Sequence, residues 1–130
     1  MYSQTTNGIM VSVEPIYLED QSSPIESKYM WAYRVTIENV GEDTVQLRHR
    51  TWKITDSTGR SQEIRGPGVV GEQPVLEPGE VYEYTSGTPL NTPSGMMVGS
   101  YGMEDKSGRC FDVPVPAFSL DSPHQAIRLN

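Results

Sequence analysis

The clearest candidate for binding chemistry is the glycine-rich segment from Gly66 to Gly71, which reads Gly-Pro-Gly-Val-Val-Gly. Its spacing matches G-x-G-x-x-G, which in dinucleotide-binding folds places a pyrophosphate on main-chain amides where a helix begins. Here Pro74 and Pro78 follow and would break a helix within its first two turns, and Pro67 has no amide hydrogen. The sequence therefore disfavours a dinucleotide-binding unit.

A loop of this composition can bind an anion without a helix, because successive main-chain amides can form a concave nest around a negative charge. The alternative, which we favour, is that the glycines adopt positive φ angles and carry the chain from one sheet to the other. The candidate anion-binding residues are Arg65, Gly66, Gly68, Val69, Val70 and Gly71.

Basic residues gather just before this loop. Positions 48–65 hold five basic and two acidic side chains, whereas the rest of the chain holds 5 basic and 15 acidic ones. Two arginines could clamp a phosphate through bidentate hydrogen bonds, but we expect those flanking His49 to lie on a solvated strand face. The candidate basic patch comprises Arg48, Arg50, Lys53 and Arg60.

Residues for catalysis or metal binding do not assemble into a known pattern. His49, His124 and Cys110 lack the spacing of a zinc motif, and Cys110 is expected to pack as a small hydrophobic residue. The segment 99–102 lacks the first glycine of a nucleophile elbow. We therefore predict no catalytic residue, no metal site, no cofactor and no enzymatic activity.

The elements that position these residues are expected to be β-strands, because 12 glycines and 10 prolines interrupt every longer run. Between 28 and 41 the odd positions are large and apolar, which is typical of a strand buried on one face. The run 44–56 begins with apolar odd positions but ends with Trp52 and Ile54, so we predict a β-bulge at 49–51.

Four further strands are predicted, at 8–18, 80–86, 96–105 and 109–118. Turn residues at 39–43 and 56–59 are typical of hairpins, and those at 105–108 join the last two strands. Three prolines require a sheet edge or a bulge: Pro15, Pro114 and Pro116. About seven to eight strands predict an all-β, immunoglobulin- or fibronectin-type-III-like sandwich of two antiparallel sheets, with most Trp and Tyr in its core.

Composition limits the class of protein. A chain of 130 residues with 35% hydrophobic residues is expected to form one domain over 1–130, with 121–130 as a flexible tail. It has no membrane-spanning apolar run, no signal peptide and a single cysteine, which together predict a cytoplasmic protein. A net charge of −7 disfavours nucleic-acid and membrane partners.

Nearly the whole chain resembles the bacterial ApaG family. The segments that carry the resemblance are 21–24, 32–37, 50–56, 66–74, 78–80, 84–87, 92–95, 97–101 and 116–120. The resemblance implies a fibronectin-type-III-like sandwich, a small cytoplasmic protein and no established catalytic activity. It also implies that the family's loop proposed for pyrophosphate corresponds to Gly66, Gly68 and Gly71.

Members of that family are often encoded beside a dinucleoside tetraphosphate hydrolase, are linked genetically to cobalt and magnesium efflux, and have relatives within eukaryotic F-box and polymerase-interacting proteins. Our leading hypothesis is a non-catalytic interaction module that engages an unidentified protein partner, or a second copy as a homodimer, through a sheet edge or the glycine-rich loop. An alternative is a sensor of phosphate, pyrophosphate or dinucleoside polyphosphate that uses the loop 66–71. A third hypothesis, from the resemblance, is an indirect role in cobalt and magnesium efflux.

Overall fold

The computed structural model describes residues 2–124, which form nine β-strands and two three-residue 3-10 turns. The strands are β1 (Tyr2–Thr6), β2 (Ile9–Tyr17), β3 (Tyr29–Asn39), β4 (Val45–Asp56), β5 (Ser61–Pro67), β6 (Val75–Leu76), β7 (Val81–Leu90), β8 (Ser94–Asp105) and β9 (Cys110–Asp121). The turns are η1 (Glu19–Gln21) and η2 (Pro24–Glu26). The described residues contain no helix with the length and apolar character needed to cross a bilayer.

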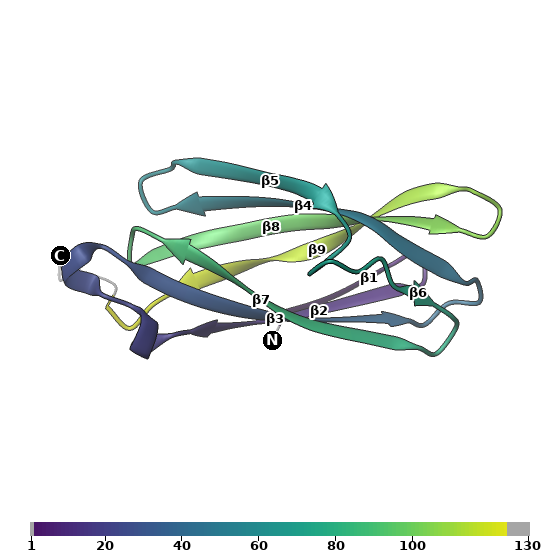
Figure 1. The fold of residues 1–130 in the computed structure, drawn as a ribbon, viewed down its shortest axis with the longest axis horizontal. Coiled ribbons are helices and arrows are strands. Elements are labelled where there is room, and N and C mark those ends of the chain that lie inside the picture. The colour runs from purple at the N-terminus through teal and green to yellow at the C-terminus, as the bar shows by residue number, and fades with distance from the viewer. Residues whose placement is uncertain (1, 125–130) are drawn as a thin grey trace.

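The strands form two antiparallel sheets that face each other across one core (Figure 1). The first sheet has the order β1-β2-β3-β7, and the second has the order β5-β4-β8-β9. The two-residue β6 pairs with β4 beyond the end of β5, so β5 and β6 follow each other along one side of β4. The predicted all-β sandwich is confirmed.

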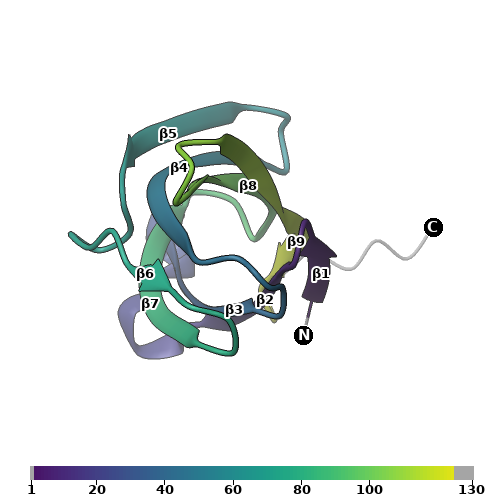
Figure 2. The ribbon, with the colours of Figure 1, turned by 90° about the vertical axis from the view of Figure 1, so that its right-hand side faces the viewer.

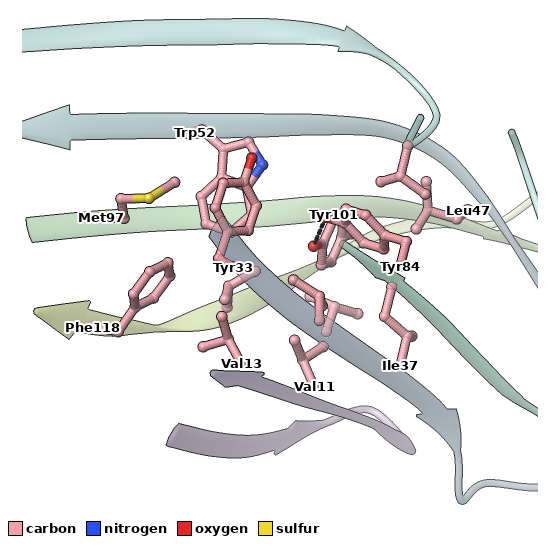
Figure 3. Packing of buried hydrophobic residues seen from close by; sticks show 14 of the residues in the cluster. Val11, Val13, Tyr33, Ile37, Leu47, Trp52, Tyr84, Met97, Tyr101 and Phe118 are labelled. Atoms are coloured by element: carbon pink, nitrogen blue, oxygen red, sulfur yellow. Dashed lines mark hydrogen bonds between the residues drawn. The ribbon is translucent and has the colours of Figure 1, made fainter. Parts of the chain in front are cut away.

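The core forms where the apolar positions of the two sheets meet (Figure 3). In β3 every odd position from Tyr29 to Asn39 is buried, which confirms the predicted alternation. Most of the aromatic residues expected in the core are buried there, and Tyr82 is partly buried. Trp52 packs edge-on against Tyr33, Tyr101 and Phe118, with ring centroids 5.3 to 6.2 Å apart.

The bulge in β4 lies one residue earlier than predicted. The register with β8 shifts between Leu47 and His49, so the extra residue is Arg48 rather than one within 49–51. Beyond the bulge, Arg50 shares the inward phase of Trp52. The bulge therefore decides which basic side chains turn toward the core.

The turn residues at 39–43 do not form the hairpin that we predicted. They carry the chain from β3 in the first sheet to β4 in the second. The buried Asn39 side chain holds this crossing, because its amide donates to the carbonyls of Asp43 at 2.8 Å and Leu76 at 3.0 Å. Turn-forming residues indicate a change of direction, but they do not tell which sheet the next strand joins.

The two other predicted turns are confirmed and are nearly identical. In Asp56–Arg60 and Asp105–Arg109, the aspartate Oδ1 accepts hydrogen bonds from the amide and hydroxyl of the third residue and from the amide of the arginine. Both turns have a glycine with positive φ in the fourth position. They lie at opposite ends of the second sheet, because β4 and β8 run antiparallel.

The structure adds strands that the sequence reasoning missed. Asn7 and Gly8 both have positive φ, as a two-residue hairpin turn requires, and they join β1 to β2. At the other terminus, β9 runs to Asp121 and the buried Ser122 donates its amide to the Pro93 carbonyl at 3.0 Å. Residues 121–124 are thus docked, and the rest of the predicted tail, 125–130, lies outside the described residues.

The two sides of the sandwich are finished differently. On one side β9 packs against β1 and β2, with the Tyr2 and Phe118 rings 6.1 Å apart, and the predicted edge prolines Pro114 and Pro116 lie in β9. On the other side the strands β5 and β7 each have one edge without a strand neighbour in the described chain (Figure 2). We call the region between these two edges the open side.

Candidate functional site

The open side has two ends. At one end the glycine-rich loop leaves β5, and we call residues 66–73 together with Arg50 the loop end (Figure 2). At the other end the beginning of β5 lies near the last residues of β7, and we call this the groove end. The candidate residues from the sequence are divided between these two ends and the outer face of the second sheet.

Each glycine of the loop has a structural reason. A Cβ on Gly66 would lie 3.0 Å from the Arg50 guanidinium, and one on Gly68 would lie 2.1 Å from the Glu72 carbonyl oxygen. Gly68 and Gly71 have φ of +60° and +82°, which confirms the predicted positive φ for these two. The loop does not cross to the other sheet, because it turns back to pair as β6, and the crossing follows at 77–80.

The tip of the loop is a tight two-residue turn. Val69 and Glu72 exchange both main-chain hydrogen bonds, at 2.8 and 2.9 Å, around Val70 and Gly71. Val69 is fully buried, whereas Val70 is 55% exposed and has a φ of +43°, which is unfavourable for a β-branched residue. The loop is therefore anchored by one valine and exposes the other.

The side chain of Arg50 holds the loop in place through hydrogen bonds. Its Nη1 donates to the carbonyl oxygens of Pro67 at 3.1 Å and Gly68 at 3.0 Å. The prediction that Arg50 lies on a solvated face is wrong, because the bulge at Arg48 turns it to the inner side of β4. Arg50 thus holds the loop in place as a structural residue.

Beneath Arg50 the hydroxyls of Tyr84 and Tyr101 form a buried hydrogen bond that links the two sheets (Figure 3). Burial is the main cause that raises the pKa of both phenols, and the nearby Arg50 charge partly offsets it. At the edge of this cluster, partial burial and the Glu72 carboxylate raise the pKa of Tyr82. The pair is neutral at physiological pH and can serve as a structural contact.

The amides of the loop are largely used within it. Gly68 donates to the Arg48 carbonyl at 2.9 Å, and Val69 and Glu72 bond each other. Among the main-chain hydrogen bonds of the described residues, none uses the amides of Val70 or Gly71. An anion would therefore meet two tip amides, and binding at the loop stays a prediction.

The predicted basic residues do not form one patch. Arg65 is paired with Glu63 at 2.5 Å on β5, and Arg48 is paired with Glu104 at 2.7 Å. Lys53 lies on the outer face of the second sheet, near a shallow depression that also contains the exposed Met96 and Val98. Arg50 points inward and Arg60 lies at the groove end. The basic side chains of positions 48–65 are therefore spread over several surfaces.

The groove end is a hollow of about 500 Å³ between the two sheets. Ile54 and Leu90, which are 6% and 5% exposed, are the buried apolar residues of its lining. Its polar lining includes Lys28 and Arg60. Sequence reasoning missed this groove because its lining comes from three separate stretches of the chain, 27–28, 54–62 and 89–91.

Asp56 also lines the groove but is occupied by its own turn. The Thr58 hydroxyl is the largest cause that lowers the pKa of the Asp56 carboxyl, and burial, the next largest cause, opposes it. The amides of Arg60 and Thr58 lower this pKa further. The Arg60 guanidinium contributes a smaller attraction in the same direction. Asp56 therefore stabilises the turn that presents Arg60.

Other reactive side chains are dispersed. Within residues 2–124 no three side chains of His, Cys, Asp or Glu come together in a geometry that could hold a metal ion. Cys110 is exposed and not packed as predicted, because it begins the edge strand β9, and its Sγ lies 3.8 Å from the Gly108 carbonyl oxygen. His124 approaches Glu19, with Nε2 and Oε1 3.0 Å apart.

Comparison with known proteins places this architecture in a family. The model of the ApaG domain matches residues 19–105. Protein ApaG of Paramagnetospirillum magneticum is 66% identical and Protein ApaG of Rhodospirillum centenum is 65% identical, each over 130 residues and the full length of both chains. The crystal structure of a putative ApaA protein from Bordetella pertussis is similar, with a TM-score of 0.87 and 48% identity over 90% of this chain and 95% of that one. The chain belongs to the ApaG domain family.

Proposed function

We propose that the protein is a non-catalytic interaction module that engages a protein partner through its open side. The observation that supports this most is the pair of edges on β5 and β7 that pair with no other strand of residues 2–124, since the edge of β9 packs against β1 and β2. An unpaired edge offers main-chain donors and acceptors to a strand of another protein.

Of the two edges, β7 is the better template. It is 10 residues long, and Glu83 is its one charged residue. The seven-residue β5 carries the ion pair of Glu63 and Arg65, and charges on an edge strand oppose pairing with another chain. We therefore expect the partner to add to β7.

The register shows which groups of β7 would be used. The carbonyl of Met30 accepts from the Leu18 amide, and the Met30 amide donates to the Ser22 hydroxyl, so the groups of Met30 point away from its partner Pro89. Along an antiparallel ladder, pairs whose main-chain groups point away from each other alternate with hydrogen-bonded pairs. The free edge of β7 therefore carries the main-chain groups of Val81, Glu83, Thr85, Gly87 and Pro89.

Site-specific crosslinking in cells tests this proposal. A photoreactive residue at Thr85 on β7 is expected to form an adduct with a distinct protein, and the same residue at the exposed Thr5 on β1 serves as the control. With that protein purified, Thr85→Pro should abolish binding, because proline removes a donor from the free edge and leaves the ladder with β3 intact. Equal adducts at both positions, or unchanged binding of Thr85→Pro, would contradict the proposal.

A further inference from the structure

The groove end joins two kinds of binding group, a buried apolar lining and a free strand edge. The buried side chains of Ile54 and Leu90 line the groove, so an apolar group placed there would contact the core directly. The unpaired edge of β7 ends beside them at Pro89. An apolar side chain and an extended main chain could thus be bound together.

The charges around the groove predict a ligand that carries negative charge. Lys28 and Arg60 line it, and neither forms an ion pair with a carboxylate of residues 2–124. By contrast, Arg34, Arg48 and Arg65 are each paired with a glutamate. The Asp56 carboxylate beside Arg60 is held by three hydrogen bonds within its turn. On a chain with a net charge of −7, this groove therefore holds two cations that are free to meet an external carboxylate.

The main-chain groups at the free edge of β7 limit the class of ligand further. Pro89 can accept but not donate a hydrogen bond, whereas Gly87 and Thr85 further along the free edge can do both. The groove lining also includes Pro89 of this edge, and a volume of about 500 Å³ is too large for a compact ion to fill. An extended peptide matches such a shape, because its main chain can follow β7 while alternate side chains enter the groove.

We propose that the groove end binds an extended peptide segment of a partner protein in which an apolar side chain stands next to carboxylates. The apolar side chain packs on Ile54 and Leu90, and the carboxylates meet Lys28 and Arg60. This rests on the proposed function and specifies the chemistry of the partner that the open side recognises.

The test selects peptides without assuming a partner. A displayed library of random peptides of about seven residues, which is long enough to follow one strand, is panned on the full chain and sequenced. The expected enrichment is in sequences that combine apolar residues with Asp or Glu. The most enriched peptide should shift the amide resonances of 60–62 and 90–91 and bind more weakly at high salt.

The two nearly identical turns, Asp56–Arg60 and Asp105–Arg109, provide a matched control. The double variant Lys28→Glu with Arg60→Glu should weaken the selected peptide by about tenfold, because two attractions become repulsions. Lys106→Glu with Arg109→Glu makes the same change of net charge, with Arg109 at the equivalent position of the second turn, and should leave the affinity unchanged. Thermal unfolding of both variants shows whether the fold is retained.

Each other outcome overturns the inference. Enrichment of basic peptides, equal loss in both double variants, or no enrichment at all would exclude an acidic peptide as the ligand. Dimerisation of the chain that the groove variant alone abolishes would assign the groove to a second copy. The crosslink at Thr85 is independent of Lys28 and Arg60, so the interaction module can stand where this assignment fails.

Discussion

The two ends of the open side are built on the same strands, yet one is filled and the other is hollow. At the loop end the polar and apolar groups are satisfied within the chain, since Arg50 donates hydrogen bonds to two loop carbonyls and Val69 is buried below the turn. At the groove end Lys28 and Arg60 have no such partners among the described residues, and Ile54 and Leu90 line an open space. The difference indicates that the glycine-rich segment closes the sandwich, and it supports our proposal that the opposite end is the one that binds a partner.

The largest expected effect comes from filling the space that Gly68 leaves. Gly68→Ala would place a Cβ 2.1 Å from the Glu72 carbonyl oxygen at a φ of +60°. We expect it to lower the free energy of unfolding by about 3 kcal/mol, from backbone strain and the clash together. Chemical denaturation of the variant and the parent chain measures this.

Gly59 at the groove end is the matched control. It also has a positive φ, of +89°, but no atom of the described residues lies within 4 Å of a Cβ built there. Gly59→Ala should therefore cost about 1 kcal/mol, the strain of the left-handed region alone. Equal losses in the two variants would mean that the loop end is not more tightly packed than the groove end.

Arg50 gives the next largest effect. Arg50→Met removes the two hydrogen bonds to Pro67 and Gly68 and should lower the free energy of unfolding by about 2 kcal/mol. Arg60→Met, at the groove end, should change it by less than about 0.5 kcal/mol because the Arg60 side chain forms no ion pair within residues 2–124. Faster amide exchange at Gly68 and Val69 in the Arg50 variant would confirm that the loop itself is released, and unchanged exchange would contradict this role.

The buried tyrosine pair beneath the loop end should also limit stability at alkaline pH. Burial raises the pKa of Tyr84 and Tyr101 above the value of about 10 that a tyrosine has in an unfolded chain. A raised pKa gives stability that is complete below the unfolded value and is lost as pH rises through the folded one. In an alkaline titration of phenolate absorbance, the folded chain should stay at least two short of its seven tyrosines until it unfolds. Ionisation of all seven with unchanged circular dichroism would refute the buried pair.

The groove end should respond at acidic pH. The Thr58 hydroxyl and the neighbouring amides lower the pKa of Asp56, so its contribution is present above the unfolded value of about 3.9 and is lost as pH falls through the folded one. Asp56→Asn keeps an acceptor oxygen but removes this titration. We expect denaturation curves collected across acidic pH to show a weaker pH dependence for Asp56→Asn than for the parent chain. The same dependence in both would show that Asp56 does not contribute.

The sequence predicted the features of these two ends that depend on neighbouring residues and missed those that depend on residues far apart in the chain. The alternation in β3 and the Asp-x-Ser/Thr-Gly turns are local signals, and both were predicted correctly. The direction of Arg50 depends on whether the bulge falls before or after it, and the spacing of apolar residues from Leu47 to Trp52 does not resolve that difference. The groove needs Lys28 and Leu90, which are more than 60 positions apart in the chain but lie beside each other at the first sheet, to face Ile54 of the second sheet, so no local pattern reveals it.

The smallest expected effect concerns the exposed tip of the loop. Val70 occupies a left-handed position in a two-residue turn, where asparagine is tolerated far better than a β-branched residue. Val70→Asn should therefore raise the free energy of unfolding by about 0.5 kcal/mol. If the loop only closes the sandwich, this variant should also keep full affinity for a peptide bound in the groove. A stabilised chain that loses the peptide would show instead that the strain at Val70 is maintained for binding, and the division between a closing end and a recognising end would then fail.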